Sequence, residues 1–247
     1  MLAEERFSKI LSIIEEAGSV TVQDLMEELG ASESTIRRDL NTMDANGLLV
    51  KVFGGAVAKN TNIRTQDENV DNRKLQNIEE KVAIAKYAAS LIQSGDFVYI
   101  DAGTSTELVI DYIKVANVTF VTNSLTHAKK LSDKGYTVYI LGGEFKSTTE
   151  AIVGEEAVET LDKYNFTKGF WGTNGVNITK GFTTPEVKEA MVKKKSMENC
   201  KERYVLADSS KFSQISSVKF SEFDNATIIT TELRNASYKK YKNIKEV

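Results

Sequence analysis

The sequence predicts an α/β protein in two parts, a small helical head with a hairpin and a larger, mostly parallel sheet covered by helices. Within residues 1–57, apolar residues recur at helical spacing in three short segments separated by glycines. From residue 76 onward, short apolar runs alternate with helical segments, which is typical of a parallel sheet. Residues 58–75 are polar with little periodicity and predict a linker. We therefore expect domains at 1–57 and 76–247.

The composition indicates a globular protein without a membrane segment. Of its 247 residues 41% are hydrophobic, enough for a sizeable core, and a net charge of −3 alone says nothing about nucleic acid. No apolar run approaches the roughly 18 residues of a membrane-spanning helix. The first residues, MLAEERFSKI, are acidic where a signal peptide is basic, and the single cysteine, Cys200, excludes an internal disulfide. A cytoplasmic protein is expected.

Three helices with recognisable ends are expected in the head. The first covers residues 4–17 and has an apolar stripe of Phe7, Ile10, Leu11 and Ile14. Thr21, with Asp24 three residues later, is a good N-cap for the second helix, and a glycine ends it. Ser32 caps the third helix, which runs to about Asn46. A tight turn between the second and third helices is typical of a helix-turn-helix.

The third helix is the candidate recognition helix. At about 100° per residue, Ile36, Leu40 and Met43 share one face, which is expected to pack on the other helices. The opposite face bears Ser34, Arg37, Arg38 and Asn41. Arginine grips phosphate or reads guanine through two hydrogen bonds, and serine and asparagine reach base edges or phosphates.

The stretch LVKVFGGAV, residues 49–57, predicts a hairpin that turns at Gly54 and Gly55. Its position after the third helix suits the wing of a winged helix-turn-helix, where Lys51 is placed to touch a phosphate. The candidate DNA-binding residues are Ser32, Ser34, Thr35, Arg37, Arg38, Asn41 and Lys51.

A solvated helix face is the alternative explanation for the two adjacent arginines. Residues 1–57 carry five basic and ten acidic side chains, so the usual basic footprint of a DNA-binding domain is absent. Three of the five basic residues nevertheless lie on the third helix and the hairpin, and this concentration favours DNA binding. A domain this acidic should bind nonspecific DNA weakly.

The second part is expected to begin with a helix over residues 77–94. Strands are then expected at 97–101, 118–122, 136–141, 168–172, 203–207 and 226–230. Helices are expected after Thr106 and over residues 125–134, 154–163 and 186–199. The strand at 226–230 is expected to be the last, followed by a basic tail, residues 234–247, that ends in a solvated helix.

Small polar residues follow five of these strands, at the carboxyl ends where parallel sheets bind ligands. In chain order they are Asp101, Gly103, Thr104, Ser105 and Thr106; Thr122, Asn123 and Ser124; Gly142 and Gly143; Thr173, Asn174 and Gly175; and Asp208 and Lys211. Five donor-bearing loops predict a polar, anionic ligand. Residues 103–106 enter a helix N-terminus, which favours phosphate, although a strand-to-helix turn alone would explain such residues in one loop.

Three other side chains are expected to be structural. His127, the only histidine, is expected at or partly below the surface, and Cys200 is expected to be an inert thiol. Trp171 is expected to pack in the core rather than stack on a ligand. No catalytic residue and no metal site is predicted.

Both parts resemble the DeoR family of bacterial transcription regulators, and the resemblance covers nearly the whole chain. In the head it is carried by SESTIRRDL, residues 32–40, and by a wing that ends in GGAV. In the second part it is carried by DAGTST, TNS, LGGE, GFTTP, EAMVK and DSSKF. The wing departs from the family's common Arg-Val-His-Gly-Gly, because it reads Lys51-Val52-Phe53-Gly54-Gly55.

The resemblance implies that the second part has a fold like that of ribose-5-phosphate isomerase and binds a phosphorylated sugar as effector. It adds Glu189 and Lys193, from EAMVK, to the expected pocket. GFTTP and DSSKF are most similar to the fructose-operon branch of the family, which implies fructose 1-phosphate.

A two-domain transcriptional repressor of a sugar-metabolism operon is therefore expected, with operator DNA and a sugar phosphate as partners and no cofactor. A homodimer or homotetramer is expected because helix-turn-helix proteins read paired half-sites. The alternative is a phosphosugar isomerase with an appended head, in which Glu189, Asp208 and Lys211 do acid/base work. Because an isomerase has no need of such a head, no enzyme activity is expected.

Overall fold

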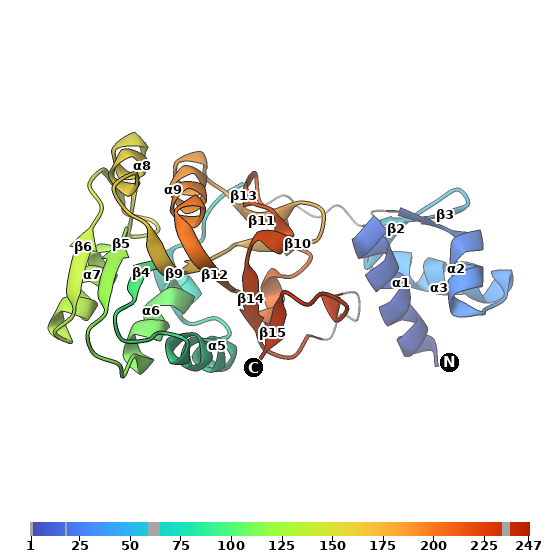
Figure 1. The fold of residues 1–247 in the computed structure, drawn as a ribbon. Helices are drawn as coiled ribbons and strands as arrows, with labels where there is room; N and C mark the ends of the chain where they lie inside the picture. Colours follow the sequence, from blue (N-terminus) through green and yellow to red (C-terminus); the bar gives the residue numbers. More distant parts are fainter. Residues whose placement is uncertain (1, 18, 59–64, 234–237) are drawn as a thin grey trace. The chain divides into compact units, whose positions relative to one another are not determined.

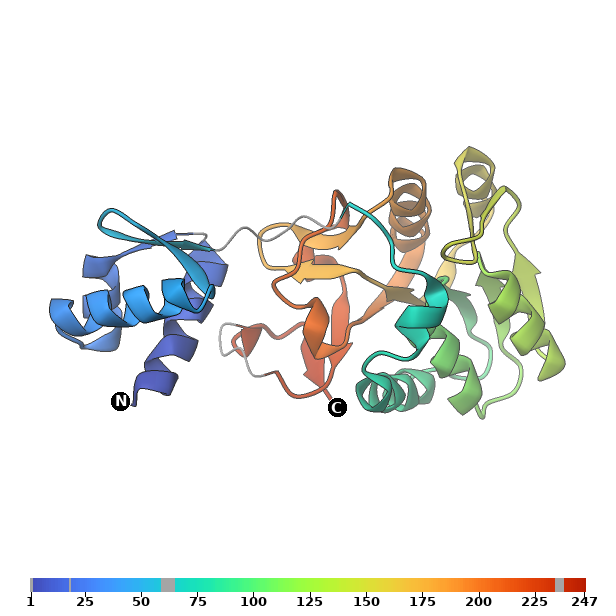
Figure 2. The same cartoon turned by 180° about the vertical axis from the view of Figure 1, so that it is seen from behind.

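The computed structural model describes residues 2–17, 19–58, 65–233 and 238–247. The chain divides into two units, one formed by residues 1–62 with 234–241 and the other by residues 63–233 with 242–247. Figure 1 and Figure 2 show the elements of each unit from two sides. Each unit has an apolar core of its own.

Among the residues that the structure describes, the first unit contains three helices and a three-stranded antiparallel sheet. The helices are α1 (Ala3–Ala17), α2 (Val22–Leu29) and α3 (Glu33–Ala45), and the strands are β1 (Ser19–Thr21), β2 (Leu49–Val52) and β3 (Gly55–Ala58), in the order β1-β3-β2. The predicted helices and hairpin are confirmed. β1 was not predicted, because three residues between two helices are too few for a strand pattern to show.

Side-chain caps mark the starts of α2 and α3, and a glycine ends α2. Thr21 Oγ1 accepts a hydrogen bond from the Asp24 N–H at 3.1 Å, and the Thr21 N–H donates to the Asp24 carboxylate at 3.2 Å. Gly30 ends α2 in the left-handed conformation, with φ of 60°, and Ser32 accepts from the Thr35 N–H at 3.4 Å. Each cap of this kind stabilises a helix by about 0.5–2 kcal/mol. The predicted boundaries follow from these local interactions.

The core of the first unit buries the apolar face of α3. Ile36, Leu40 and Met43 are fully buried, as the helical spacing predicts. An ion pair beside them was not predicted: the Arg6 guanidinium donates to both carboxylate oxygens of Asp39, at 2.6 and 3.0 Å. This pair joins α1 to α3 and compensates the charge of Asp39, which is only 4% exposed.

A seven-stranded parallel sheet forms the centre of the second unit. Its strands are β4 (Phe97–Ile100), β5 (Thr119–Thr122), β6 (Thr137–Ile140), β9 (Phe166–Gly172), β12 (Cys200–Leu206), β14 (Thr227–Thr230) and β15 (Ile244–Glu246), in the order β15-β14-β12-β9-β4-β5-β6. The helices that cover this sheet are α5 (Ile78–Ser90), α6 (Thr104–Tyr112), α7 (Leu125–Asp133), α8 (Glu155–Leu161) and α9 (Val187–Glu198). The predicted parallel α/β architecture is confirmed.

Helices cover both faces of this sheet (Figure 1, Figure 2). α5, α6 and α7 lie on one face, where Ile84 and Phe170 belong to a common apolar cluster. α8 and α9 lie on the other face, where Trp171 Nε1 donates to Ser196 Oγ of α9 at 2.9 Å. Trp171 is fully buried and stacks on Tyr99 with 5.7 Å between ring centres, so it packs in the core as predicted.

Five short strands outside the main sheet were not predicted. β7 (Glu144–Lys146) pairs with β8 (Ala151–Val153), and β10 (Gly175–Asn177), β11 (Gly181–Thr184) and β13 (Val218–Ser221) form an antiparallel sheet. Strands of three or four residues are too short for apolar alternation to stand out from the sequence.

The end of the chain differs from its prediction. β15 pairs in parallel with β14, so the predicted strand at 226–230 is not the last strand. The predicted helix at the end of the chain is wrong for residues 244–246, which form β15. Pairing with a neighbouring strand, which the sequence pattern does not report, decides the conformation here. Residues 234–237 of the predicted tail and 59–64 of the predicted linker lie outside the described residues.

The structure also differs from the predicted linker at residues 65–75. Helix α4 (Val70–Lys74) lies within this range. Val70 is only 6% exposed, and its N–H donates to a carbonyl in the β7–β8 turn at 3.3 Å. The Asp67 carboxylate pairs with the Lys146 ammonium at 2.5 Å. Charged side chains of residues 65–75 form ion pairs with the second unit and are not left to water. A polar sequence alone is therefore not sufficient to identify a linker.

We predict that a fragment of residues 65–247 melts at a higher temperature than a fragment of residues 76–247. Burying one valine stabilises by about 1.5–3 kcal/mol, and each kcal/mol shifts the melting temperature of a domain of this size by about 2–4 °C. Circular dichroism melts of the two purified fragments measure the difference. Equal melting temperatures would show that residues 65–75 add nothing to the second unit.

His127 lies deeper than predicted, in the interior side of α7. It is 2% exposed, and burial lowers its pKa from 6.5 to about 3. The imidazole is therefore neutral in the folded protein near neutral pH. Its Nδ1 has no hydrogen-bond partner among the residues that the structure describes.

We predict that this histidine makes the folded state less stable as the pH falls below 6.5. The unfolded chain then takes up a proton that the folded chain refuses until about pH 3, so the free energy of unfolding falls by up to about 1.4 kcal/mol per pH unit. Urea unfolding at pH 7.5, 6.5 and 5.5 should show a flatter dependence for His127→Gln than for the parent. Identical slopes in the two proteins would contradict the buried, neutral imidazole.

Candidate functional site

The seven candidate DNA-binding residues lie on α3, on its cap and on the hairpin of the first unit. Ser32, Ser34, Arg37, Arg38, Asn41 and Lys51 are exposed and Thr35 is half-buried. Ser34, Arg37, Arg38 and Asn41 lie on the face of α3 opposite to its buried residues. Their contact with DNA stays a prediction, but their side chains are placed where a partner can reach them.

Local hydrogen bonds already engage part of this surface. The Arg37 guanidinium pairs with the Glu33 carboxylate at 2.7 Å, one turn earlier on α3, and both side chains are about half exposed. Ser32 Oγ lies 3.1 Å from Ser34 Oγ and 2.9 Å from Thr35 Oγ1. Arg37 must therefore exchange an exposed ion pair, which is weak in water, for any contact with DNA.

The hairpin carries exposed apolar side chains that the sequence pattern did not single out. Phe53, at the turn between β2 and β3, is fully exposed, and Val50 and Val52 are each 42% exposed. The Lys51 N–H donates to the Asp44 carboxylate at 3.0 Å, which ties β2 to the end of α3. The tip of the hairpin, at Phe53, is thus apolar, and the cation of Lys51 comes two residues before it in the sequence.

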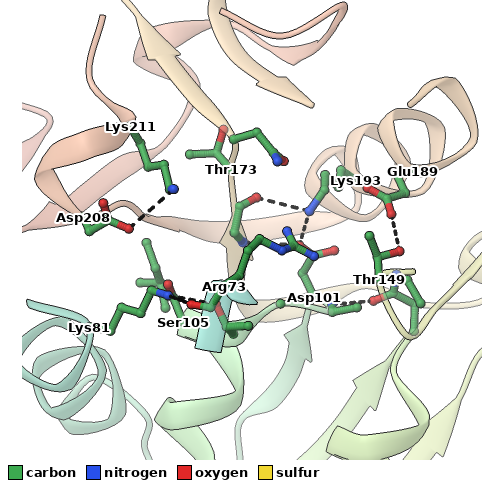
Figure 3. A pocket seen from close by; sticks show the side chains of 18 residues that line it. Arg73, Lys81, Asp101, Ser105, Thr149, Thr173, Glu189, Lys193, Asp208 and Lys211 are labelled. Atoms are coloured by element: carbon green, nitrogen blue, oxygen red, sulfur yellow. Dashed lines mark hydrogen bonds and ion pairs between the residues drawn. The ribbon is translucent and has the colours of Figure 1, made fainter. Parts of the chain in front are cut away.

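The second unit has a pocket at the carboxyl ends of β4, β9 and β12 (Figure 3). β4 has β5 on one side and β9 on the other, so the chain order reverses at this point of the sheet, as it does where ligands bind in open α/β folds. The predicted residues that line the pocket are Asp101, Gly103, Thr104, Ser105, Asn123, Thr173, Asn174, Glu189, Lys193, Asp208 and Lys211.

Six predicted residues do not line the pocket: Thr106, Thr122, Ser124, Gly142, Gly143 and Gly175. Thr106 Oγ1 donates to the Asp101 carbonyl at 2.6 Å, and Thr122 Oγ1 accepts from the Ser124 N–H at 3.1 Å. Ser124 Oγ in turn caps α7 by accepting from the His127 N–H at 3.3 Å. These hydroxyls hold the loops in shape, and a position at a strand end alone did not decide which way a side chain points.

Sequence reasoning missed three polar side chains of the lining, Arg73, Lys81 and Thr149. Arg73 comes from α4, in the supposed linker, and Thr149 from the β7–β8 turn. Lys81 left a detectable signal in the sequence, because it lies three residues before Ile84 and so on the same face of α5. In the structure it is only 4% exposed. A lysine on an apolar helix face needs a buried partner or a ligand.

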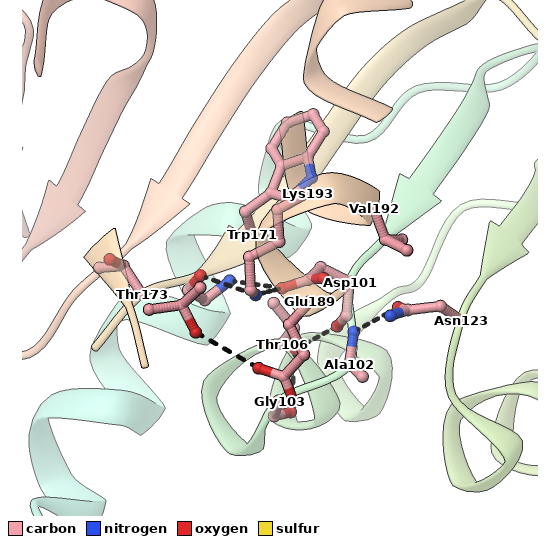
Figure 4. Close-up of polar contacts among 12 residues, drawn as sticks. Asp101, Ala102, Gly103, Thr106, Asn123, Trp171, Thr173, Glu189, Val192 and Lys193 are labelled. Atoms are coloured by element: carbon pink, nitrogen blue, oxygen red, sulfur yellow. Dashed lines mark hydrogen bonds and ion pairs between the residues drawn. The ribbon is translucent and has the colours of Figure 1, made fainter. Parts of the chain in front are cut away.

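An aspartate and a lysine meet at the floor of the pocket (Figure 4). The Lys193 ammonium contacts the Asp101 carboxylate and donates to the Gly172 carbonyl at 3.1 Å, while the Gly172 N–H donates to Asp101 Oδ2 at 3.2 Å. Burial raises the pKa of Asp101, although Lys193 opposes the change. Asp101 Oδ1 has no hydrogen-bond partner among the described residues, so it is an open acceptor.

Glu189 lies one turn before Lys193 on α9 and accepts several hydrogen bonds. Its donors are Thr149 Oγ1 at 2.6 Å, Lys146 Nζ at 3.1 Å and Thr184 Oγ1 at 3.3 Å. Burial opposes its ionisation, but Lys193, Thr149 and Lys146 outweigh burial and hold the pKa of Glu189 below its usual value. This end of the pocket presents carboxylate oxygens in a buried setting, which suits ligand hydroxyl groups.

The other end of the pocket gathers cations around the N-terminus of α6. No side chain caps this helix, and Lys81 Nζ donates to Thr104 Oγ1 at 3.2 Å. Burial lowers the pKa of Lys81, and the nearby charges of Lys211 and Arg73 lower it further, while Asp208 raises it. Uncapped backbone N–H groups together with several cations form a setting that suits a phosphate.

The residues that the structure describes contain no group of His, Cys, Asp and Glu side chains that could hold a metal ion. The Cys200 thiol is buried, and burial raises its pKa to about 12, as an inert thiol requires. None of the described helices is long and apolar enough to cross a membrane.

Comparison with known proteins assigns both units. Residues 6–62 match the DeoR-like helix-turn-helix domain, and residues 76–232 match the DeoR C terminal sensor domain. The chain is 43% identical over 242 residues to the "Uncharacterized HTH-type transcriptional regulator FruR" of Bacillus subtilis (strain 168). This match covers 98% of this chain and 96% of the relative. It is 35% identical to the HTH-type transcriptional regulator IolR of the same organism, over 92% and 90% of the two chains.

A third relative is the lactose phosphotransferase system repressor of Streptococcus mutans, which is 32% identical over 95% of this chain and 94% of its own. Among solved structures, ribose 5-phosphate isomerase A from Methanocaldococcus jannaschii aligns with 56% of this chain and 55% of its own, at 19% identity and a TM-score of 0.41.

All three sequence relatives are described as regulators or repressors and match over nearly their whole length. The expectation that the chain is not an enzyme is confirmed by these relatives. The helix-turn-helix of the first unit and the sensor domain of the second are the two parts that the resemblance predicted. This chain belongs to the DeoR family of transcriptional regulators.

Proposed function

We propose that the chain represses a sugar-metabolism operon and that a phosphorylated sugar, bound in the pocket of the second unit, releases it from operator DNA. The observation that carries the proposal is the chemistry of the pocket. Its lining joins a cluster of cations at an uncapped helix N-terminus to buried carboxylates with an open acceptor. A phosphate at one end and hydroxyl groups at the other are the complement of such a lining.

The phosphate end is the N-terminus of α6. The N–H groups in the first turn of a helix lack intrahelical acceptors, and the helix dipole adds a partial positive charge there. Lys81 and Lys211 both line this end of the pocket, and Lys211 lies 3.8 Å from Asp208. A doubly charged phosphate would offset this excess of positive charge.

The hydroxyl end is formed by Asp101, Glu189 and the amide of Asn174. Asp101 Oδ1 is an open acceptor, and the lowered pKa of Glu189 favours its ionised form. Carboxylates accept hydrogen bonds from sugar hydroxyls, and a buried acceptor that finds no donor penalises an analogue without the hydroxyl. This arrangement supports a sugar rather than an inorganic phosphate as effector.

Fructose 1-phosphate is the first candidate. The relative with 43% identity carries the name FruR, and another relative is a repressor of a lactose phosphotransferase system. Fructose 1-phosphate also has a phosphate monoester and several hydroxyl groups, as the two ends of the pocket require.

The DNA-binding side of the proposal involves the exposed face of α3 and the hairpin. Helix-turn-helix proteins place such a helix in the major groove and bind paired half-sites as dimers. We infer a homodimer or homotetramer on that ground. A regulator of this kind acts where the chromosome lies, which in a bacterial cell is the cytoplasm.

A panel of sugar phosphates tests the effector. Fructose 1-phosphate should raise the melting temperature of the full-length protein more than fructose does, because bound ligand stabilises the folded state. Calorimetry with and without operator DNA then tests the coupling between the two sites. Operator DNA must lower the affinity for the sugar phosphate by the same factor as the sugar phosphate lowers the affinity for operator DNA. If no sugar phosphate in the panel binds, the proposed effector site is wrong.

We predict that Thr104→Asp weakens the binding of fructose 1-phosphate at least tenfold, or about 1.4 kcal/mol of binding free energy. The new carboxylate would stand at the N-terminus of α6 and beside Lys81, where it repels phosphate and occupies the same donors. Thr104→Asn is the matched control, because it keeps the size and polarity of the aspartate without its charge. Calorimetry on folded Thr104→Asp protein that gives the parent's affinity would refute a phosphate site at this loop.

We predict that Arg37→Ala weakens specific operator binding by about 1–3 kcal/mol if the guanidinium reads a base. If it grips a phosphate instead, the loss is uniform across sequences and the salt dependence becomes shallower. Fluorescence anisotropy on an operator selected from random DNA measures both. Lys9→Ala removes one exposed cation from α1 and serves as the control. Parent-like affinity and salt dependence in folded Arg37→Ala would remove Arg37 from the interface.

A further inference from the structure

Arg73 lines the pocket from a segment that neither family domain covers. The matched regions end at residue 62 and begin again at residue 76, and Arg73 lies between them on α4. Its Nε is buried without a hydrogen-bond partner, and none of the ion pairs among the residues that the structure describes involves Arg73. Arg73 as a whole is half-buried, and a guanidinium with a buried, unsatisfied Nε beside a pocket needs an explanation.

The backbone around Arg73 is held firmly to the second unit. Lys81 Nζ donates to the Arg73 carbonyl at 2.5 Å, and Val70, one turn earlier, is 6% exposed. Asp67 pairs with Lys146, which also donates to Glu189 on the opposite side of the pocket. The position of Arg73 in the lining therefore follows from contacts of its neighbours and does not depend on a partner for its own side chain (Figure 3).

The charges near Arg73 are mostly of the same sign. Lys81 and Lys211 lie in the same end of the pocket, and the charges of Arg73 and Lys211 both disfavour the protonated form of Lys81. Asp208 offsets one of these cations, and the carboxylate of Glu68, which is near Lys81, also accepts from Gln76 at 3.2 Å. An unliganded pocket thus keeps cations close together at a cost that a bound anion would remove.

We propose that Arg73 binds the phosphate group of the effector, so that residues 67–77 are part of the sugar-phosphate site. This inference rests on the proposed function. A guanidinium offers two parallel N–H donors that match two oxygens of a phosphate monoester, which an ammonium cannot do. Arg73, Lys81 and the first turn of α6 would then surround the phosphate from three different elements of the second unit.

The test uses full-length Arg73→Gln and Arg73→Lys, with Lys74→Gln as the matched control. Lys74 is the adjacent cation on the same helix, does not line the pocket and pairs with Glu107 at 3.5 Å. Calorimetry with fructose 1-phosphate, fructose 6-phosphate, glucose 6-phosphate and inorganic phosphate gives the affinities. Thermal melts without ligand give the stability of each variant.

Arg73→Gln should lower the affinity for the most tightly bound sugar phosphate at least tenfold. The affinity of Arg73→Lys should lie between those of Arg73→Gln and the parent, and the affinity of Lys74→Gln should stay within about twofold of the parent. Without ligand, Arg73→Gln should melt no lower than the parent, because it removes an unpaired cation. A purely structural arginine would instead lower the unliganded melting temperature and leave the affinity of the folded protein unchanged.

The outcomes separate this inference from the proposed function. If the parent binds a sugar phosphate and Arg73→Gln binds it equally well, Arg73 is not a ligand residue, while the proposed function stands. If the parent binds none of the four compounds, the sugar-phosphate site itself is wrong and the role of Arg73 falls with it. Equal losses in Arg73→Gln and Lys74→Gln would mean a general effect of charge and would also overturn the inference.

Discussion

The contact between the Asp101 carboxylate and the Lys193 ammonium is the constraint around which the second unit is arranged. Both groups are almost fully buried, and either one without the other would be an uncompensated charge inside the protein. The contact fixes the end of β4 against α9 (Figure 4). Gly172, which bonds to both groups, adds the end of β9. Glu189 then follows one turn away on α9, and Lys146, which also pairs with Asp67, compensates its charge together with Lys193. The polar layout of the pocket follows from balancing these charges.

Local rules of sequence predicted much of this molecule. The hydroxyl groups of Thr21 and Ser32 cap α2 and α3, and because such residues are preferred at helix starts, these boundaries could be predicted. The strands of the main sheet, apart from β15, were also predicted. Because the carboxyl ends of these strands share one edge, Asp101 and Asp208 could be predicted as pocket residues. The remainder depends on contacts between distant residues. β15 is a strand only because β14 lies beside it, and the direction of a side chain at a strand end depends on how its loop packs.

The segment from Asp67 to Lys81 illustrates the limit of composition as a guide. Its sequence is polar, and polar runs without periodicity usually stay in water. Here the Asp67 side chain is 5% exposed because a lysine from β7 meets it, and one valine supplies the apolar contact. A sequence shows that charges are present but not whether their partners are water or protein. The two cations that sequence reasoning missed, Arg73 and Lys81, both belong to this segment.

The reversal of strand order between β4 and β9 has a consequence for the lifetime of the regulator. β4, β5 and β6 come from one continuous stretch of chain, and β9, β12, β14 and β15 from the stretch that follows. The pocket draws residues from both stretches, so a bound effector holds the two halves of the sheet together. Ligand at about 100 times its dissociation constant adds about 2.7 kcal/mol to the stability of the folded state. Opening of the sheet, and proteolysis of the opened form, would slow accordingly. Supply of the effector would then raise the number of regulator molecules in the cell as well as the fraction that carries ligand.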